Sequence, residues 1–110
     1  MSRNSTFHTG HPPHNRLSEI KNYLNEGKFF IGRKARDGAF YDFNWGQAEI
    51  VRALKNLKLS HFHKKEVHWT NPRVVVDYYK ARDLFGENVY THFHIDPEED
   101  KLIINSFKEI

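Results

Sequence analysis

Two short segments of the chain carry histidines in a pattern that could do chemistry: SHFHKK at residues 60–65 and THFHID at residues 91–96. On a β-strand, alternate side chains point to the same face, so the two imidazoles of each His-x-His pair would lie together. Such imidazoles can bind a metal ion, can move protons, or can lie on a surface strand without a special role. The spacing alone leaves these three interpretations open.

A metal site would draw four nitrogen ligands from the two pairs, namely His61, His63, His92 and His94. The sequence places no carboxylate clearly as a further ligand or as a support for the ligands, and it does not make the two strands neighbours. The chain also has no cysteine, which excludes thiolate ligands and disulfide bonds. We therefore expect no metal and no other cofactor, and keep a histidine-based metalloprotein as the lesser alternative.

The same residue types suit the cleavage of RNA without a metal. In that reaction the 2′-OH of the RNA attacks the adjacent phosphate, and the protein supplies a base, an acid and cations. Tyr90, His92 and His94 alternate along one segment, and Lys64 follows His63 in another. Histidine and tyrosine move protons and lysine neutralises phosphate charge, so every required residue type is present. These types are also common on strands that have no catalytic role.

Other catalytic classes lack their usual motifs. The chain contains no GxxxxGK[ST] phosphate-binding loop, no GxSxG, no GxGxxG and no HExxH. Seventeen Lys and Arg residues against fourteen Asp and Glu give a net charge of +3, which weakly favours an anionic partner.

Helical periodicity appears in two places and predicts helices over residues 16–26 and 46–58. The apolar stripes are Leu17, Ile20, Tyr23 and Leu24 in the first, and Ile50, Ala53, Leu54 and Leu57 in the second. Residues 28–45 have no clean period, so the sequence places no long element there.

The C-terminal half contains four segments rich in β-formers: HFHKKEVHW, RVVVDYYKA, NVYTHFHID and KLIINSFKE. Short connections between them predict antiparallel neighbours, and helices followed by strands predict an α+β fold with two N-terminal helices on a C-terminal antiparallel sheet. In the third strand, alternation directs Thr91 and Phe93 toward the core. It therefore places Tyr90, His92 and His94 together on an exposed polar face.

The length of 110 residues predicts one domain. Residues 1–13 are rich in Ser, Thr, His, Gly and Pro, so we expect a flexible tail followed by a single domain over residues 14–110. No apolar run approaches the roughly 20 residues that span a bilayer, and no signal peptide is evident. We expect a soluble, cytoplasmic protein without a membrane partner.

Five segments in consistent order resemble the motility quorum-sensing regulator (MqsR) toxins, which are type II toxin–antitoxin ribonucleases with a RelE-like fold. The resemblance covers roughly residues 13–110 and rests most on its first and last segments. The segments are PHNRLSEIKNYLNEGK at 13–28, FHKK at 62–65, DYY at 77–79, GENVY at 86–90 and SFKE at 106–109.

The resemblance implies a ribosome-independent endoribonuclease that cuts single-stranded mRNA at short GCU-like sites and arrests translation. It also implies a cognate antitoxin protein, which we expect to carry a helix-turn-helix DNA-binding domain. The family's functional lysines and tyrosine fall on Lys64, Lys108 and Tyr90. One position departs from the family pattern, because Val76 stands where the family has glutamine before its Asp-x-Tyr.

Residues and resemblance together give a site hypothesis with Tyr90 and His92 as proton movers and Lys64 and Lys108 as cations for the phosphate. His63 lies beside Lys64 in sequence, although the pleat should turn it to the opposite face. The further RNA-binding candidates are His63, His94 and the basic residues of GRKAR at 32–36, which are Arg33, Lys34 and Arg36. A solvated loop explains GRKAR equally well. The alternative function is a catalytically degenerate RNA-binding or antitoxin-binding protein of the same fold.

Overall fold

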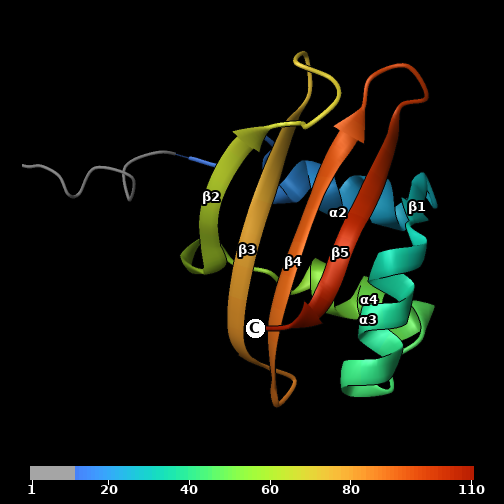
Figure 1. The fold of residues 1–110 in the computed structure, drawn as a ribbon, viewed down its shortest axis with the longest axis vertical. Helices are drawn as coiled ribbons and strands as arrows, with labels where there is room; N and C mark the ends of the chain where they lie inside the picture. The colour runs from blue at the N-terminus through green and yellow to red at the C-terminus, as the bar shows by residue number, and fades with distance from the viewer. Residues whose placement is uncertain (1–11) are drawn as a thin grey trace, which may run out of the picture.

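The computed structural model describes residues 12–110, so most of the expected tail over residues 1–13 lies outside the described residues. Figure 1 shows the arrangement of the elements in space. In chain order they are α2 (Leu17–Asn25), β1 (Phe29–Ile31), α3 (Arg33–Phe43), α4 (Gln47–Lys55), the 3₁₀ turn η1 (Leu59–His61), β2 (Phe62–Val67), β3 (Val75–Leu84), β4 (Glu87–Asp96) and β5 (Lys101–Glu109).

The strands form one mixed sheet in the order β1-β5-β4-β3-β2. Strand β1 runs parallel to β5, and every other neighbouring pair is antiparallel. Helices α2 and α4 lie behind the sheet in Figure 1, α3 lies beside β5, and the face toward the viewer has no helix over it. The predicted α+β fold and its four antiparallel C-terminal strands are confirmed.

The two predicted helices are confirmed, with the second ending at Lys55. Each begins with a glutamate that returns to the chain before the helix: Glu19 accepts a hydrogen bond from the backbone N–H of Arg16, and Glu49 accepts one from Gly46. Their apolar stripes and the inward side chains of the sheet form one core. Its largest fully buried side chains include Ile20, Ile50, Leu54, Tyr79, Phe93 and Phe107.

Residues 28–45, where the sequence placed no long element, form β1 and the eleven-residue helix α3. The buried stripe of α3 consists of Ala35, Ala39 and Phe43, which carries little hydrophobic signal. Gly38 interrupts the pattern, yet it is required by packing. A Cβ at this position would lie 2.4 Å from the carbonyl oxygen of Phe107, so the helix rests directly on the backbone of β5.

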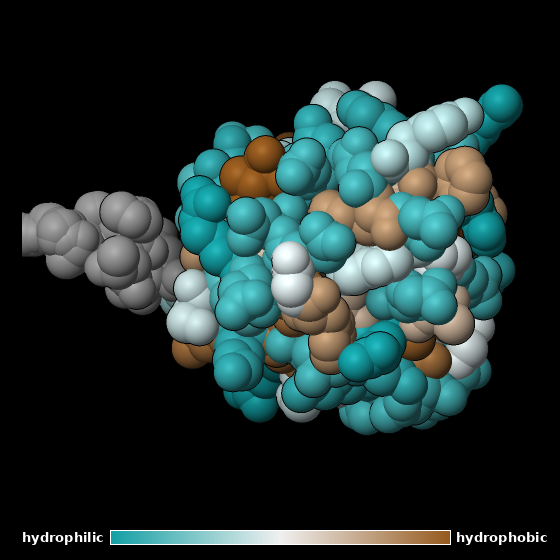
Figure 2. Space-filling view, turned by 90° about the horizontal axis from the view of Figure 1, so that it is seen from below, coloured by the Kyte–Doolittle hydropathy of each residue, from teal (hydrophilic) through white to brown (hydrophobic). Residues whose placement is uncertain are grey.

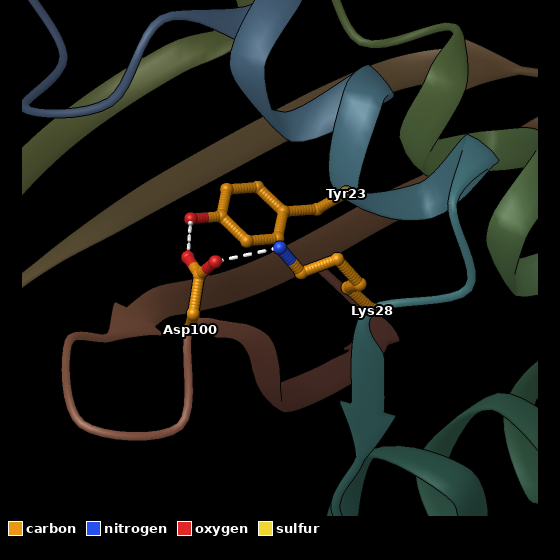
Figure 3. A network of polar contacts seen from close by, with 3 residues as sticks. All are labelled: Tyr23, Lys28 and Asp100. Atoms are coloured by element: carbon orange, nitrogen blue, oxygen red, sulfur yellow. Dashed lines mark hydrogen bonds and ion pairs between the residues drawn. The ribbon is translucent and has the colours of Figure 1, made fainter.

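A polar network on the surface joins three parts of the chain (Figure 3). The Tyr23 hydroxyl of α2 donates a short hydrogen bond to the Asp100 carboxylate, and Lys28, just before β1, places its Nζ 2.6 Å from Oδ2 of Asp100. The hydrogen bond to Asp100 raises the pKa of Tyr23 to about 12. The network therefore ties α2 and β1 to the turn between β4 and β5.

A buried carboxylate fixes the start of the described chain. Oδ1 of Asp77 on β3 accepts a hydrogen bond from the backbone N–H of His14 at 2.9 Å, and Oδ2 accepts one from Asn15 at 2.9 Å. Asp77 is fully buried, and its desolvation raises the carboxyl pKa despite these hydrogen bonds.

Figure 2 shows the molecule from below, relative to the view of Figure 1. This surface is mostly hydrophilic, and its hydrophobic patches are small and separate. Among residues 12–110, no helix combines the length and apolar character needed to cross a membrane.

Candidate functional site

A row of aromatic and imidazole rings crosses the helix-free face of the sheet. Tyr90 and His92 lie on β4 with ring centroids 5.8 Å apart, and Tyr78 of β3 lies directly opposite His92 with centroids 4.6 Å apart. The predicted placement of Tyr90, His92 and His94 on one strand face agrees with the observed burial of Thr91 and Phe93 on the other. Ring contacts across β3 and β4 therefore give this face a partly apolar floor.

Lysines on the two neighbouring strands, β2 and β5, flank the row of rings. Lys64 of β2 pairs with Tyr78 in the sheet and places its Nζ 4.9 Å from the Tyr78 ring centroid. Lys108 of β5 pairs with Tyr90 and places its Nζ 5.5 Å from the Tyr90 ring centroid. The structure thus brings together Lys64, Tyr90, His92 and Lys108, the four residues expected to be catalytic.

A β-bulge decides how β2 presents its side chains. The register shifts between Phe62, which pairs with Tyr79, and Lys64, which pairs with Tyr78. Phe62 packs on Tyr79 of the core with ring centroids 5.5 Å apart. The next pair along the strands, Lys64 and Tyr78, faces the opposite side of the sheet. His63 is the exposed extra residue of the bulge, so the simple pleat assumed from the sequence does not apply to it.

The expected exposure of His94 is wrong, because its side chain is 8% exposed. The β2–β3 loop folds over it, and the ring of His68 meets the His94 ring at 4.8 Å between centroids. On the other side, the Asn105 amide nitrogen lies 2.8 Å from Nδ1 of His94. His94 therefore supports the site from between the β2–β3 loop and Asn105, and little of its surface is left for direct contact with a substrate.

His92 is half-buried, and its Nδ1 has no hydrogen-bond partner among the described residues. Burial, followed by the positive charges of Lys34 and Lys108, lowers the pKa of His92 to about 4. The imidazole is therefore neutral at pH 7 and able to accept a proton.

Tyr90 has the opposite protonation state. Its burial raises the phenol pKa above the ordinary value of 10.0, with Lys64 acting against this and Glu66 adding to it. Tyr90 is thus protonated at neutral pH and able to donate a proton. The two groups on β4 are matched as an acceptor and a donor.

A carboxylate, Glu66, shares the edge of the site with Lys64. Oε2 of Glu66 lies 3.1 Å from the Lys64 Nζ, and this ion pair lowers the Glu66 pKa. Both side chains are about half exposed, at 45% for Lys64 and 52% for Glu66. An arriving phosphate would compete with Glu66 for the lysine.

The GRKAR segment is the N-cap and first turn of α3 rather than a loop. Arg33 is exposed, and its Nε lies 3.9 Å from Oδ2 of Asp37. Lys34 is close enough to His92 to lower the pKa of that imidazole. Arg36 points its Nε to the carbonyl oxygen of Ile31 at 3.1 Å, so it supports the fold. Arg33 and Lys34 also line a groove of about 640 Å³ between α3 and β5, together with Asp37, Gly38, Tyr41, Asp42, Ser106 and Lys108.

The two His-x-His pairs lie apart in the sheet, because β3 separates β2 from β4. Within residues 12–110, no group of three or more His, Cys, Asp or Glu side chains is placed to hold a metal ion. The four-histidine arrangement considered from the sequence is therefore not formed.

Sequence reasoning missed several members of this face. Alternation along β2 was enough to add Glu66, because it follows Lys64 by two residues. Tyr78 comes to the site through the pairing of β3 with β4, which places it opposite His92. No sequence signal indicated that His68 and Trp69 of the β2–β3 loop would fold over β4, or that Asn105 would reach His94.

Comparison with known proteins gives one family. The family model described as "Motility quorum-sensing regulator, toxin of MqsA" matches residues 12–109, nearly the whole chain. No curated protein matches the sequence.

Proposed function

The chain belongs to the MqsR family, the toxins of toxin–antitoxin systems whose antitoxin is MqsA, and from this premise we propose that it is an endoribonuclease that cuts single-stranded mRNA and arrests translation. The observation that carries the proposal is the pairing of a neutral His92 with a protonated Tyr90 between two lysines. This arrangement supplies a base, an acid and cations on one open sheet face.

In the proposed reaction, His92 accepts the proton of the RNA 2′-OH while the 2′-oxygen forms a bond to the adjacent phosphorus. The bond from phosphorus to the 5′-oxygen breaks, and Tyr90 donates its phenolic proton to that leaving oxygen. The products are a 2′,3′-cyclic phosphate and a 5′-hydroxyl. Exchange of protons with water then restores both side chains.

Lys64 and Lys108 stabilise the negative charge that builds up on the phosphate oxygens. They approach from β2 and from β5, so a phosphate lying over Tyr90 would have an ammonium group on each side. Electrostatic stabilisation of this kind requires no metal ion, so the proposed activity is metal-independent. The proposed enzyme cuts the mRNA at GCU-like sequences.

The partner part of the proposal concerns the domain type of the antitoxin. We propose a small antitoxin with a helix-turn-helix DNA-binding domain, encoded beside this chain. Toxicity on induced expression, relieved by the neighbouring gene, is the matching observation. Toxicity that the neighbouring gene does not relieve would contradict it.

A second candidate function is supported by Val76. This residue is fully buried on β3, where the family pattern has a polar glutamine before Asp-x-Tyr. Because the chain lacks that amide, the alternative function is a protein that binds RNA or antitoxin without cutting RNA.

Purified protein incubated with mixed-sequence RNA separates these candidates. We expect cleavage that is unchanged by EDTA and that is lost on the matched 2′-deoxy substrate, because the 2′-OH is the attacking group. Binding without cleavage would support the second candidate. Cleavage that EDTA abolishes would contradict the metal-independent mechanism.

A further inference from the structure

An exposed tryptophan stands beside the proposed catalytic pair. Trp69 lies in the loop between β2 and β3, and 61% of its surface is exposed. Its ring stacks on His68 with centroids 4.0 Å apart and planes inclined by 24°. One face of the indole is thus supported by the protein, and a large part of the aromatic surface is open to solvent.

The supporting histidine is itself held in place. Nδ1 of His68 accepts a hydrogen bond from the backbone N–H of Thr70 at 3.1 Å, and the backbone N–H of His68 donates one to the carbonyl oxygen of Val74 at 2.8 Å. The edge of the His68 ring also packs against buried His94. Because the indole stacks on this held ring, a ligand that binds to it loses less ordering entropy than it would on an unsupported side chain.

The position of Trp69 relates it to the chemistry. Its ring centroid lies 6.2 Å from that of His92, with the planes nearly perpendicular at 84°. A planar group stacked on the indole would therefore lie within one nucleotide of a phosphate placed over Tyr90 and His92.

The charges around this surface favour an anionic ligand. Lys34, Lys64 and Lys108 all act on the pKa of His92, so three cations converge on the same part of the face. An exposed aromatic ring beside a cluster of cations is the combination by which proteins bind single-stranded RNA, with stacking for bases and charge for phosphates.

We propose that Trp69 is a substrate-binding residue that stacks on the nucleobase of a nucleotide next to the scissile phosphate of single-stranded RNA. This inference rests on the proposed ribonuclease function and adds the base-binding subsite to it. Stacking on one base contributes about 1–3 kcal/mol in comparable sites, which corresponds to about a 5- to 150-fold change in affinity.

The test compares Trp69→Ala and Trp69→Phe with wild type in two assays. In cleavage of a defined RNA, we expect Trp69→Ala to raise KM at least 5-fold with a smaller effect on kcat, and Trp69→Phe to recover most of the loss. The matched control is Phe85→Ala, because Phe85 is also exposed but contacts Arg52 of α4 on the helix-covered side of the sheet.

The second assay uses tryptophan fluorescence, since the chain has only two tryptophans, Trp45 and Trp69. A 2′-O-methyl oligonucleotide, which cannot be cleaved, is expected to quench the emission of wild type and of Trp45→Phe but not that of Trp69→Ala.

The outcomes distinguish the two levels of the account. If wild type cleaves RNA but Trp69→Ala has unchanged KM and unchanged quenching, the stacking inference is overturned and the ribonuclease proposal stands. If wild type neither cleaves RNA nor binds the oligonucleotide, both are overturned. Lowered kcat at unchanged KM would also overturn the inference, because it would assign Trp69 to the chemical step.

Discussion

Tyr78 of β3 and His92 of β4 oppose each other across the sheet with ring centroids 4.6 Å apart. The two rings are in contact at an interplanar angle of 37°, and burial of the imidazole keeps it neutral. This relationship links the strand register directly to the chemistry, because a shift of one residue would move one of the two rings to the other face of the sheet.

The low pKa of His92 has a kinetic consequence. With a pKa of about 4, the imidazole can accept a proton at any higher pH. We expect kcat/KM for RNA cleavage to stay level from about pH 8 down to about pH 5 and to fall only on approach to the pKa of the free enzyme. A pH profile of initial rates checks this, and a fall centred near the ordinary value of 6.5 would contradict it.

Loss of either flanking lysine should reduce the chemical step. Lys64→Ala and Lys108→Ala each remove a cation beside the phosphate, and we expect kcat to fall by about 100- to 1,000-fold. Lys101→Ala serves as the control, because Lys101 lies at the other end of β5 and its Nζ is 3.7 Å from Glu99. Equal rates for all three variants would remove the lysines from the mechanism.

The close contact of α3 with β5 predicts an unusual effect of Gly38→Ala. Glycine to alanine inside a helix normally stabilises by about 0.5–1 kcal/mol. Here the new methyl group would meet the Phe107 carbonyl oxygen at 2.4 Å, so we expect a loss of about 1–3 kcal/mol in the free energy of unfolding. Urea unfolding measures it, with Asn22→Ala on the exposed side of α2 as control. Stabilisation by Gly38→Ala would show that α3 does not rest on β5 in this way.

Asp77 should contribute to stability through the chain segment that it holds. Asp77→Ala removes the acceptor of the His14 and Asn15 backbone N–H groups, and we expect a cost of at least about 2 kcal/mol. Asp37→Ala, which changes an exposed carboxylate on α3, should stay within about 0.5 kcal/mol of wild type. Similar unfolding curves for both variants would argue against the anchoring role.

Much of the fold could be predicted from residue patterns, since two helices and four strands have strong apolar periods. Helix α3 could not, because its buried stripe uses alanines and its glycine is explained only by the backbone of β5. Strand β1 has three residues and is defined by pairing with β5, a partner more than seventy residues away in the chain.

The candidate site was likewise predictable only in part from the sequence. Alternation on β4 was sufficient to bring Tyr90 and His92 together. The bulge at His63 and the loop that carries Trp69 depend on contacts between distant segments, so the pleat rule failed for β2 and gave no hint of the covering loop.

The most direct test of the central claim is single-turnover cleavage of a defined RNA by wild type, Tyr90→Phe and His92→Ala, each confirmed to be folded. We expect each substitution to slow the chemical step by about 100- to 10,000-fold, because each removes one proton-transfer group. Full cleavage rates in both variants would contradict the assignment of acid and base to β4.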